Sequence, residues 1–346
     1  MDEIRGQQST DWRDVYAMRI ATAGALPYIR PDSVREELAK PVERTWPLVA
    51  VAQLDGRPTV VARAHIQLGW GRRGHVATLT LEQHPDVGDE GSRSVLQEAV
   101  HVAEDWFNTR RLQTTLSPNN PAHIALFESL GFKQEARLRQ SVRVAGELVD
   151  EIILARLSGD VARLTPSPVP APAPSADRTR PRPHITIRGG SIDDWEAQHA
   201  IWSQPEVIWG TLQIPYPSAD WNRQRIQERA PARFWPLMAE VDGKVVGVTG
   251  LQWDEHNRLH AGHIGMMVHT DYQAMGVGSA LLQAAIELAE NWMGMTRLQL
   301  EVFTDNTRAI RLYTRHGFEV EGLHRAHSYR DGQYADTLVM GRLRKG

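Results

Sequence analysis

Short apolar runs and longer apolar periods alternate along the chain, and one such alternation in its last third organises the rest. Residues 264–268, Ile-Gly-Met-Met-Val, form a short apolar run that predicts a buried strand. Residues 273–278 follow as a loop that contains two glycines. We expect a helix from Ser279 onward, because the next apolar residues recur at the spacing of one helix face: Leu281, Leu282, Ala285, Leu288 and Trp292.

The same pattern occurs twice. Trp292 lies 186 positions after Trp106, and the same interval separates further identical pairs. These pairs are Leu112 and Leu298, Asn120 and Asn306, Ile124 and Ile310, Gly131 and Gly317, Phe132 and Phe318, and Asp150 and Asp336. An interval of this length indicates a duplicated domain, since solenoid repeats recur after only about 20–50 residues.

Each copy has the same order of predicted elements: helix, β-hairpin, strand, helix, strand, helix and a final pair of strands. Two apolar runs flank Asp55-Gly56, and two more flank Asp242-Gly243, as in tight hairpins. Gly131 and Gly317 follow the last predicted helix of each copy, where glycine adopts the left-handed conformation without strain. This order predicts an α/β (α+β) fold, with a mixed and mostly antiparallel central sheet flanked by helices.

A proline-rich segment, residues 165–183, joins the copies, and its prolines are too dense for a helix or a strand. We therefore expect a first domain, residues 1–164, a linker, residues 165–183, and a second domain, residues 184–346. The sequence leaves open whether the two domains pack as an intramolecular pseudo-dimer and whether the chain forms homodimers.

Composition and charge narrow the class of protein. The chain has no cysteine and a formal net charge of -3, which argues against disulfides, cysteine-ligated zinc and general nucleic-acid binding. Its first residues lack the apolar core of a signal peptide, and no apolar run has the length of a membrane span. We expect a cytoplasmic protein that binds neither nucleic acid nor membranes.

The glycine loop, residues 273–278, has the chemistry of a phosphate site. Backbone N–H groups at a helix N-terminus lack partners and favour negative charge, and glycine lets a phosphate approach the backbone closely. The alternative is a tight turn without a ligand. The first copy departs from this pattern, because Glu90 and Ser92 stand at the positions of the two glycines.

With this loop the second copy resembles the GCN5-related N-acetyltransferase (GNAT) superfamily, whose phosphate signature is Arg/Gln-x-x-Gly-x-Gly/Ala. Residues 273–278 match the signature, and Asn306, Tyr313 and Gly317-Phe318 follow in the family's order. The resemblance extends over both copies as two tandem domains. The second copy is also similar to the bacterial L-amino-acid N-acetyltransferases in several stretches: residues 204–207, 211–215, 300–306 and 317–322.

The resemblance implies an enzyme that transfers an acetyl group from acetyl-CoA directly to an amine. It assigns acetyl-CoA binding to the end of the central strand, to the glycine loop and to two later residues: Met267, Val268, Gln273, Ala274, Met275, Gly276, Val277, Gly278, Ser279, Asn306 and Tyr313. In the first copy Glu90 would place a carboxylate beside the diphosphate, so we predict that this degenerate copy binds acetyl-CoA poorly or not at all. The alternative is a shifted loop around residues 88–91.

Three residues are candidates for proton transfer. The resemblance places Tyr313 where it protonates the departing thiolate, and a phenol is protonated at neutral pH. Glu301 lies in a predicted strand, on the opposite face from its apolar neighbours, and is one candidate base. His263, whose residue type titrates near neutral pH, is the other. Each of the three has a structural alternative, namely core packing for Tyr313 and structural hydrogen bonding for the two candidate bases.

The acceptor is expected to be a small primary amine, by preference the α-amino group of an apolar or aromatic L-amino acid. Residues 202–221 are aromatic and rich in proline, which suits a pocket wall, and we select from them Trp209, Leu212, Gln213 and Tyr216 as substrate-binding residues. The alternatives are acetylation of a protein N-terminus, a polyamine or an amine toxin, and a non-catalytic module that binds acetyl-CoA for regulation.

No metal site is expected. Four histidines lie close together in the sequence, but they fall in or between predicted strands and lack the pattern of a helical zinc site: His256, His260, His263 and His269.

Overall fold

The computed structural model describes residues 3–22, 30–39, 43–85, 87–168, 183–228 and 233–345, and the chain divides into two compact units. The N-terminal unit comprises Met1–Arg137, Arg143–Thr165 and Ala326–Tyr329, and the C-terminal unit comprises Leu138–Val142, Pro166–Arg325 and Arg330–Gly346. Most of the predicted linker, residues 169–182, lies outside the described residues.

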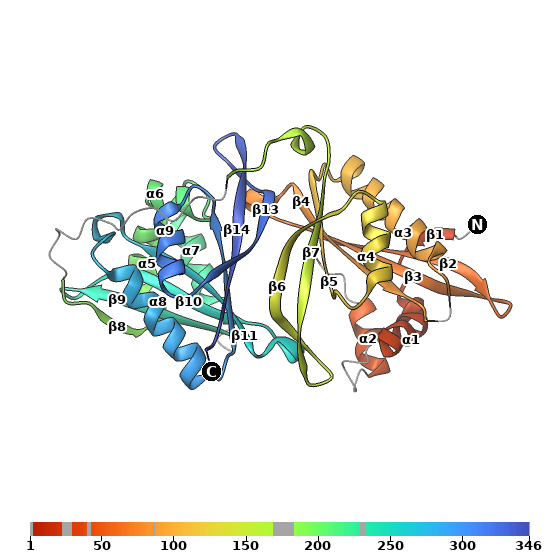
Figure 1. The fold of residues 1–346 in the computed structure, drawn as a ribbon, viewed down its shortest axis with the longest axis horizontal. Coiled ribbons are helices and arrows are strands. Elements are labelled where there is room, and N and C mark those ends of the chain that lie inside the picture. Colours follow the sequence, from red (N-terminus) through yellow and green to blue (C-terminus); the bar gives the residue numbers. More distant parts are fainter. Residues whose placement is uncertain are drawn as a thin grey trace. The chain divides into compact units, whose positions relative to one another are not determined.

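The C-terminal unit is built on a sheet with the strand order β8-β9-β10-β11-β12-β14-β13 (Figure 1). The strands are β8 (Thr186–Gly189), β9 (Phe234–Val241), β10 (Lys244–Trp253), β11 (Ala261–Val268), β12 (Arg297–Phe303), β13 (Glu319–Arg330) and β14 (Gln333–Leu343). Neighbours from β8 to β11 pair antiparallel, as do β12 and β14, whereas β11 and β12 run parallel. This parallel pair lies in the middle of the sheet, where the chain crosses over through a helix.

Helices cover both faces of this sheet. They are α5 (Trp195–Trp202), α6 (Pro205–Gly210), α7 (Ala219–Gln227), α8 (Val277–Glu287) and α9 (Thr307–Arg315). The main core lies between the sheet and α8 with α9, and Val268 of β11 packs against it. A smaller cluster includes Met267 and residues of α5, α6 and α7. Because neighbouring strand residues point to opposite faces, Val268 and Met267 mark the two helical layers.

The bounds of α8 differ from the prediction at its start. The helix begins at Val277 with Gly276 as its N-cap, two residues before the predicted first residue, Ser279. A glycine with a left-handed backbone can end the loop this early, whereas the sequence periodicity becomes visible only at the first apolar helix residues.

The end of α8 also differs from an ideal helix. The backbone widens into a π-helical turn at Leu288–Trp292, which shifts the phase of the following side chains. Trp292, expected on the apolar helix face, is therefore 84% exposed, and Trp106, at the end of the equivalent turn in the first copy, is 77% exposed.

The N-terminal unit repeats the architecture, with the strand order β1-β2-β3-β4-β5-β7-β6. Its strands are β1 (Glu3–Gly6), β2 (Thr45–Leu54), β3 (Arg57–Leu68), β4 (Val76–Gln83), β5 (Arg111–Leu116), β6 (Lys133–Val144) and β7 (Glu147–Leu157). Its helices are α1 (Trp12–Thr22), α2 (Pro31–Ala39), α3 (Glu90–His101) and α4 (Pro121–Ser129). The predicted fold class is confirmed, since each unit has a mixed, mostly antiparallel sheet flanked by helices.

The predicted interval between the copies needs one correction. Strands β5 and β12 begin at Arg111 and Arg297 and keep the interval found in the sequence, but their partners Val76 and Ala261 are one position closer together. Residues 84–89 lead from β4 into α3, and this segment is two residues shorter than residues 269–276, which lead from β11 into α8. No helix in the described part of the chain is long and apolar enough to cross a bilayer.

Candidate active site

A wedge opens in the C-terminal sheet between the ends of β11 and β12. The two strands pair only from Ala261 with Arg297 to His263 with Gln299. Beyond this point β11 continues on β10 and β12 continues on β14. The facing edges of residues 264–268 and 300–303, which we call the wedge, thus have no partner in the opposite strand.

The direction of the backbone groups in the wedge follows from two hydrogen bonds at the ends of β11. The carbonyl of His260 accepts from Arg297 N–H on the β12 side (3.1 Å), and His269 N–H donates to a carbonyl of β10 (2.8 Å). In a strand the N–H and C=O of one residue point to the same edge, and successive residues alternate between the two edges. The N–H and C=O groups of Met266 and Val268 therefore point into the wedge. An extended ligand that contains amide groups could pair with these two residues as an added strand does.

The glycine loop forms a left-handed turn at the start of α8. Ala274 has a φ of 65° and Gly276 a φ of 99°. Both lie in the left-handed region of backbone conformation, in which residues other than glycine are strained. Among the described residues no side chain caps α8, and Ala280 N–H makes the first helical hydrogen bond, to Gly276 (3.0 Å). The N–H groups of residues 277–279 therefore stand at the positive end of the helix, as an anion site requires.

Two further residues of the loop are fixed by their neighbours. A Cβ on Gly278 would lie 3.2 Å from Leu312, so the glycine allows α8 and α9 to approach each other closely. The Gln273 side chain donates to the Val268 carbonyl (3.2 Å) and accepts from Arg308. Gln273 thus ties the loop to the end of β11.

Asn306 acts as the N-cap of α9. Its Oδ1 accepts from Ala309 N–H (3.2 Å), and Asn120 makes the equivalent bond to His123 (3.2 Å) in the N-terminal unit. The structural alternative for Asn306 is therefore present in both copies, and its contact with acetyl-CoA stays a prediction.

Tyr313 lies on the buried face of α9. Its ring packs against Phe318 with centroids 6.0 Å apart, much as Phe127 packs against Phe132 at 5.1 Å in the N-terminal unit. Both copies thus use this position for core packing, and the hydroxyl is what distinguishes the second copy. Burial raises the pKa of Tyr313 to about 12, so the phenol keeps its proton throughout the neutral range.

Glu301 lies on the sheet face opposite to α8 and α9. Its neighbours Leu300 and Val302 belong to the main core, so the alternation of the strand directs Glu301 to the face of Met267. The Glu301 carboxylate lies 3.8 Å from Nδ1 of the buried His324. A carboxylate with a histidine beside it on this face has the chemistry of a general base.

His263, the other candidate base, is held between two neighbours. Its Nδ1 lies 3.1 Å from Nε2 of Gln299, and its Nε2 lies 3.5 Å from Asp254. The hydrogen bond from His263 is the main cause of a lowered pKa of Asp254. The other histidines considered as metal ligands have separate partners. His269, for instance, contacts Gln204 at 2.7 Å.

Arg330, which no sequence pattern identified, connects α6 with the end of β12. Its guanidinium stacks on Trp209 (4.2 Å) and Phe303 (4.5 Å), donates to the Trp209 carbonyl (3.0 Å) and pairs with Asp305 (3.2 Å). Trp209 and Arg330 are 121 residues apart, and no local pattern in the sequence links residues so distant.

The remaining predicted substrate residues differ in burial. Gln213 is buried, and its Nε2 lies 3.9 Å from Sδ of Met267. Leu212 is exposed, and Tyr216 is 99% exposed with a φ of 59°. The structure thus brings Gln213 to β11 and leaves Tyr216 on the surface.

The N-terminal unit keeps the wedge but lacks the left-handed turn. Strands β4 and β5 pair only from Val76 to Thr78. Among the described residues between β4 and α3, none has a positive φ, and α3 begins at Glu90 with Asp89 as its N-cap. The Gln83 side chain bridges this loop by donating to Val87 (3.2 Å) and Asp89 (3.1 Å).

The opposite sheet face of the N-terminal unit carries a buried network of charges. With the corrected register of β4 and β11, Glu82 takes the place of Met267. Its carboxylate pairs with Arg63 (2.8 Å), which is only 2% exposed, and with Arg19 (3.0 Å), which also pairs with Glu37 (2.6 Å). These charges satisfy one another where the C-terminal unit has an apolar cluster.

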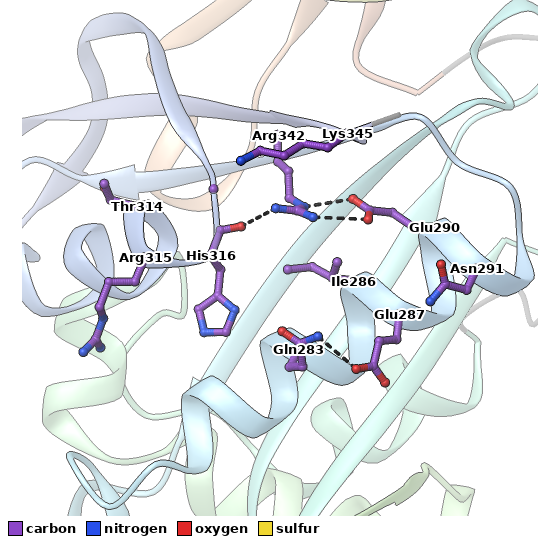
Figure 2. Close-up of a pocket in the computed structure, with 11 residues that line it drawn as sticks. Gln283, Ile286, Glu287, Glu290, Asn291, Thr314, Arg315, His316, Arg342 and Lys345 are labelled. Atoms are coloured by element: carbon purple, nitrogen blue, oxygen red, sulfur yellow. Dashed lines mark hydrogen bonds and ion pairs between the residues drawn. The ribbon is translucent and has the colours of Figure 1, made fainter.

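A separate hollow of about 480 Å³ lies between α8 and the segment after α9 (Figure 2). Arg342 crosses it, pairing with Glu290 (2.8 Å) and donating to the His316 carbonyl (2.7 Å). Arg156 makes the same two contacts, with Glu104 (2.8 Å) and the Leu130 carbonyl (2.6 Å), in the unit that lacks the phosphate turn. The hydrogen-bonded clamp shown in Figure 2 is therefore a structural feature of both copies.

Comparisons with known proteins show what the C-terminal unit is similar to. The sequence model of the acetyltransferase (GNAT) family matches residues 195–318. The L-amino acid N-acetyltransferase AaaT of Escherichia coli (strain K12) is 37% identical over 161 residues, which are 46% of this chain and 98% of that protein. An N-alpha-acetyltransferase of Sulfurisphaera tokodaii is 35% identical over 138 residues, 34% of this chain and 81% of that protein. A solved GNAT-family acetyltransferase from Streptococcus pneumoniae, 28% identical, covers 46% of this chain and 100% of its own with a TM-score of 0.41.

Proposed function

Because the chain belongs to the acetyltransferase (GNAT) family and so uses acetyl-CoA as acetyl donor, we propose that its C-terminal unit acetylates the α-amino group of an apolar or aromatic L-amino acid. The observation that carries this proposal is the wedge beside the N-terminus of α8, which no side chain of the described residues caps. Open backbone groups on β11 and the left-handed turn at Gly276 meet at the same end of the sheet. The proposal treats residues 184–346 as the active domain, residues 165–183 as the linker and residues 1–164 as a degenerate copy.

The residues of the wedge and the loop would divide the binding of acetyl-CoA between them. The N–H groups of residues 277–279 would hold the diphosphate. The N–H and C=O of Met266 would pair with the amide-bearing arm in place of the predicted Met267, because the backbone groups of Met267 face β10. Val268 N–H would donate to the thioester oxygen, where negative charge develops during acyl transfer. Bound acetyl-CoA supplies the activated acetyl group.

Proton transfer is assigned to groups on the two faces of the sheet. The amine nitrogen attacks the thioester carbon and passes a proton to Glu301 or His263, the candidate bases on the face of Met267. As the carbon–sulfur bond breaks, the Tyr313 hydroxyl gives its proton to the sulfur of the departing CoA. An unchanged pH–rate profile in both Glu301→Gln and His263→Ala would assign the base to water instead.

The side chains near β11 and the end of β12 support the choice of acceptor. Trp209 stacks on Arg330 at the end of β12, Gln213 contacts Met267, and Leu212 lies between them in the sequence. The similarity to a bacterial L-amino acid N-acetyltransferase over nearly its whole length supports the same choice.

Release of the CoA thiol with a panel of amines tests the proposal. We expect kcat/KM for L-phenylalanine and L-methionine to exceed that for spermidine, and that for a peptide with a free N-terminus, by at least about tenfold, since each tenfold preference requires only about 1.4 kcal/mol of transition-state binding. Turnover with spermidine or peptides alone would show that the acceptor is one of these amines and not an amino acid. No turnover with any amine would favour a regulatory module that binds acetyl-CoA.

The N-terminal unit is not expected to contribute a second acetyl-CoA site. It has Asp89 and Glu90 at the start of α3 and a Gln83 side chain across the loop. Calorimetric titration of the full chain with acetyl-CoA should therefore give a stoichiometry of about one, because carboxylates at a helix N-terminus disfavour a diphosphate there. A stoichiometry near two would refute this assignment and support the shifted loop around residues 88–91.

A further inference from the structure

Arg225 of α7 is a partly buried cation with no counter-charge among the described residues. Its guanidinium lies 5.3 Å from the ring centre of Trp202 and 5.2 Å from that of Trp221, and Nη1 donates to Oε1 of Gln213 (3.1 Å). In the described part of the chain no carboxylate lies within 4.0 Å of it, and burial alone lowers the pKa of Arg225. A buried charge without a partner is unfavourable, so this arrangement needs a reason.

Other arginines of the C-terminal unit show what is missing at Arg225. Arg188 pairs with Asp194 (2.7 Å) and Glu240 (2.7 Å), and these carboxylates raise the pKa of Arg188. Arg342 pairs with Glu290 (2.8 Å). Arg225 has instead two aromatic rings and a neutral amide as partners, which leaves its charge available to an anion from outside the chain.

The guanidinium is placed to take that anion along its edge. The two indole rings lie near the guanidinium group, and one of its five N–H groups is used by Gln213. The remaining N–H groups can form the two parallel hydrogen bonds with which arginine binds a carboxylate. Aromatic neighbours also limit access of water and so strengthen the pairing.

Arg225 is also connected to the strand that borders the wedge. Gln213, its hydrogen-bond partner, contacts Sδ of Met267 at 3.9 Å, and Met267 precedes Val268, whose N–H faces the wedge. An amine placed for attack beside Val268 would therefore have Gln213 and Arg225 on the side that faces away from the wedge.

We propose that Arg225 binds the carboxylate of the acceptor amino acid and so selects α-amino acids over amines without a carboxylate. This inference rests on the proposed function, because it concerns the acceptor of the same reaction. Gln213 is a positioning residue in it, since its amide orients the guanidinium and separates it from Met267.

The test compares L-phenylalanine with L-phenylalanine amide, which lacks the negative charge. In Arg225→Met we expect KM for the acid to rise at least about 30-fold, a loss of about 2 kcal/mol as is common for a buried charge pair that is broken. KM for the amide and the Kd of acetyl-CoA should change less than about threefold. Arg223→Met is the matched control, because Arg223 stacks on Trp195 (5.6 Å) from the same helix and should leave both values unchanged.

A second variant keeps Arg225 but gives its guanidinium a carboxylate partner within the chain, so that it can no longer bind the carboxylate of the substrate. Gln213→Glu supplies a carboxylate where the present amide accepts from Arg225, so it should raise KM for the acid while keeping or raising the melting temperature. Equal changes for acid and amide in both variants would overturn carboxylate recognition and leave Arg225 a structural role.

Calorimetry separates this proposal from the proposed function. L-phenylalanine should bind the CoA complex of the wild-type protein more tightly than its amide does, and Arg225→Met should abolish the difference, even if no amine is turned over. If the wild-type protein binds or acetylates the amide as well as the acid, the role of Arg225 is refuted, whereas acetyl transfer to a primary amine stands.

Discussion

Replacing Tyr313 with phenylalanine is expected to lower kcat about 100-fold, at the lower end of the range for a lost general acid or base. The ring would keep its packing against Phe318, as Phe127 does against Phe132, and the Kd of acetyl-CoA should change less than about threefold. Steady-state kinetics with the best amine of the panel, together with calorimetric titration of acetyl-CoA, measure the two effects. Tyr272→Phe is the control, because Tyr272 precedes the glycine loop and its edge contact with His269 survives in phenylalanine.

The pH dependence gives an independent check of the buried phenol. Its pKa is raised from an ordinary value of about 10 to about 12, so ionisation is harder in the folded state than in the unfolded state. The resulting stabilisation is complete below about pH 10 and is lost as the pH rises through 12. The free energy of unfolding of the wild type should thus fall by about 2 to 3 kcal/mol relative to Tyr313→Phe over this range. Parallel curves for the two proteins would show that the hydroxyl is not buried as described.

Replacing Gly276 with glutamate is expected to raise the Kd of acetyl-CoA at least about 30-fold. A left-handed backbone costs a residue with a Cβ about 1–2 kcal/mol, and the new carboxylate would repel the diphosphate at the start of α8. The substitution also reproduces Glu90 of the first copy, so it tests why that copy should lack the ligand. Calorimetric titration with acetyl-CoA provides the measurement.

Two further variants separate strain from charge in this experiment. Gly332→Glu introduces the same residue at a comparable φ of 76° in the turn between β13 and β14, where a Cβ meets nothing within 4 Å. It should destabilise the protein by a similar amount and leave the Kd unchanged. Gly276→Ala introduces strain without charge, so it should raise the Kd of acetyl-CoA by less than Gly276→Glu does. Tight binding by Gly276→Glu would mean that the diphosphate lies elsewhere.

The features that could be predicted from the sequence depend on neighbouring residues. The hairpin turn at Asp242-Gly243 and a strand that contains Glu301 were predicted from local patterns and agree with the structure. The glycine loop was found in the same way, because a left-handed turn needs glycine within a few positions of the helix start. The start of α8 was misplaced by two residues, since the cap at Gly276 has no apolar period.

The features that were missed depend on residues far apart in the chain or on one-residue changes. Arg330 meets Trp209 across 121 residues, and Arg63 of the N-terminal unit meets Glu82 only because β3 and β4 are paired. The one-position change of the interval at β4 can be seen only from the strand register, and it makes Glu82 rather than Leu81 the equivalent of Met267. The sequence could not single out Arg225 among the arginines. Its lack of a carboxylate partner among the described residues becomes visible only in the folded chain.

Hydrogen exchange of the full chain with and without CoA tests the central claim most directly. We expect slower exchange of backbone amides in residues 264–282 on addition of CoA, because these amides line the wedge and the start of α8. The equivalent segment of the N-terminal unit, residues 79–96, serves as an internal control and should not change. Equal protection of both segments, or none in residues 264–282 at saturating CoA, would contradict the assignment of the diphosphate to the main-chain amides of α8.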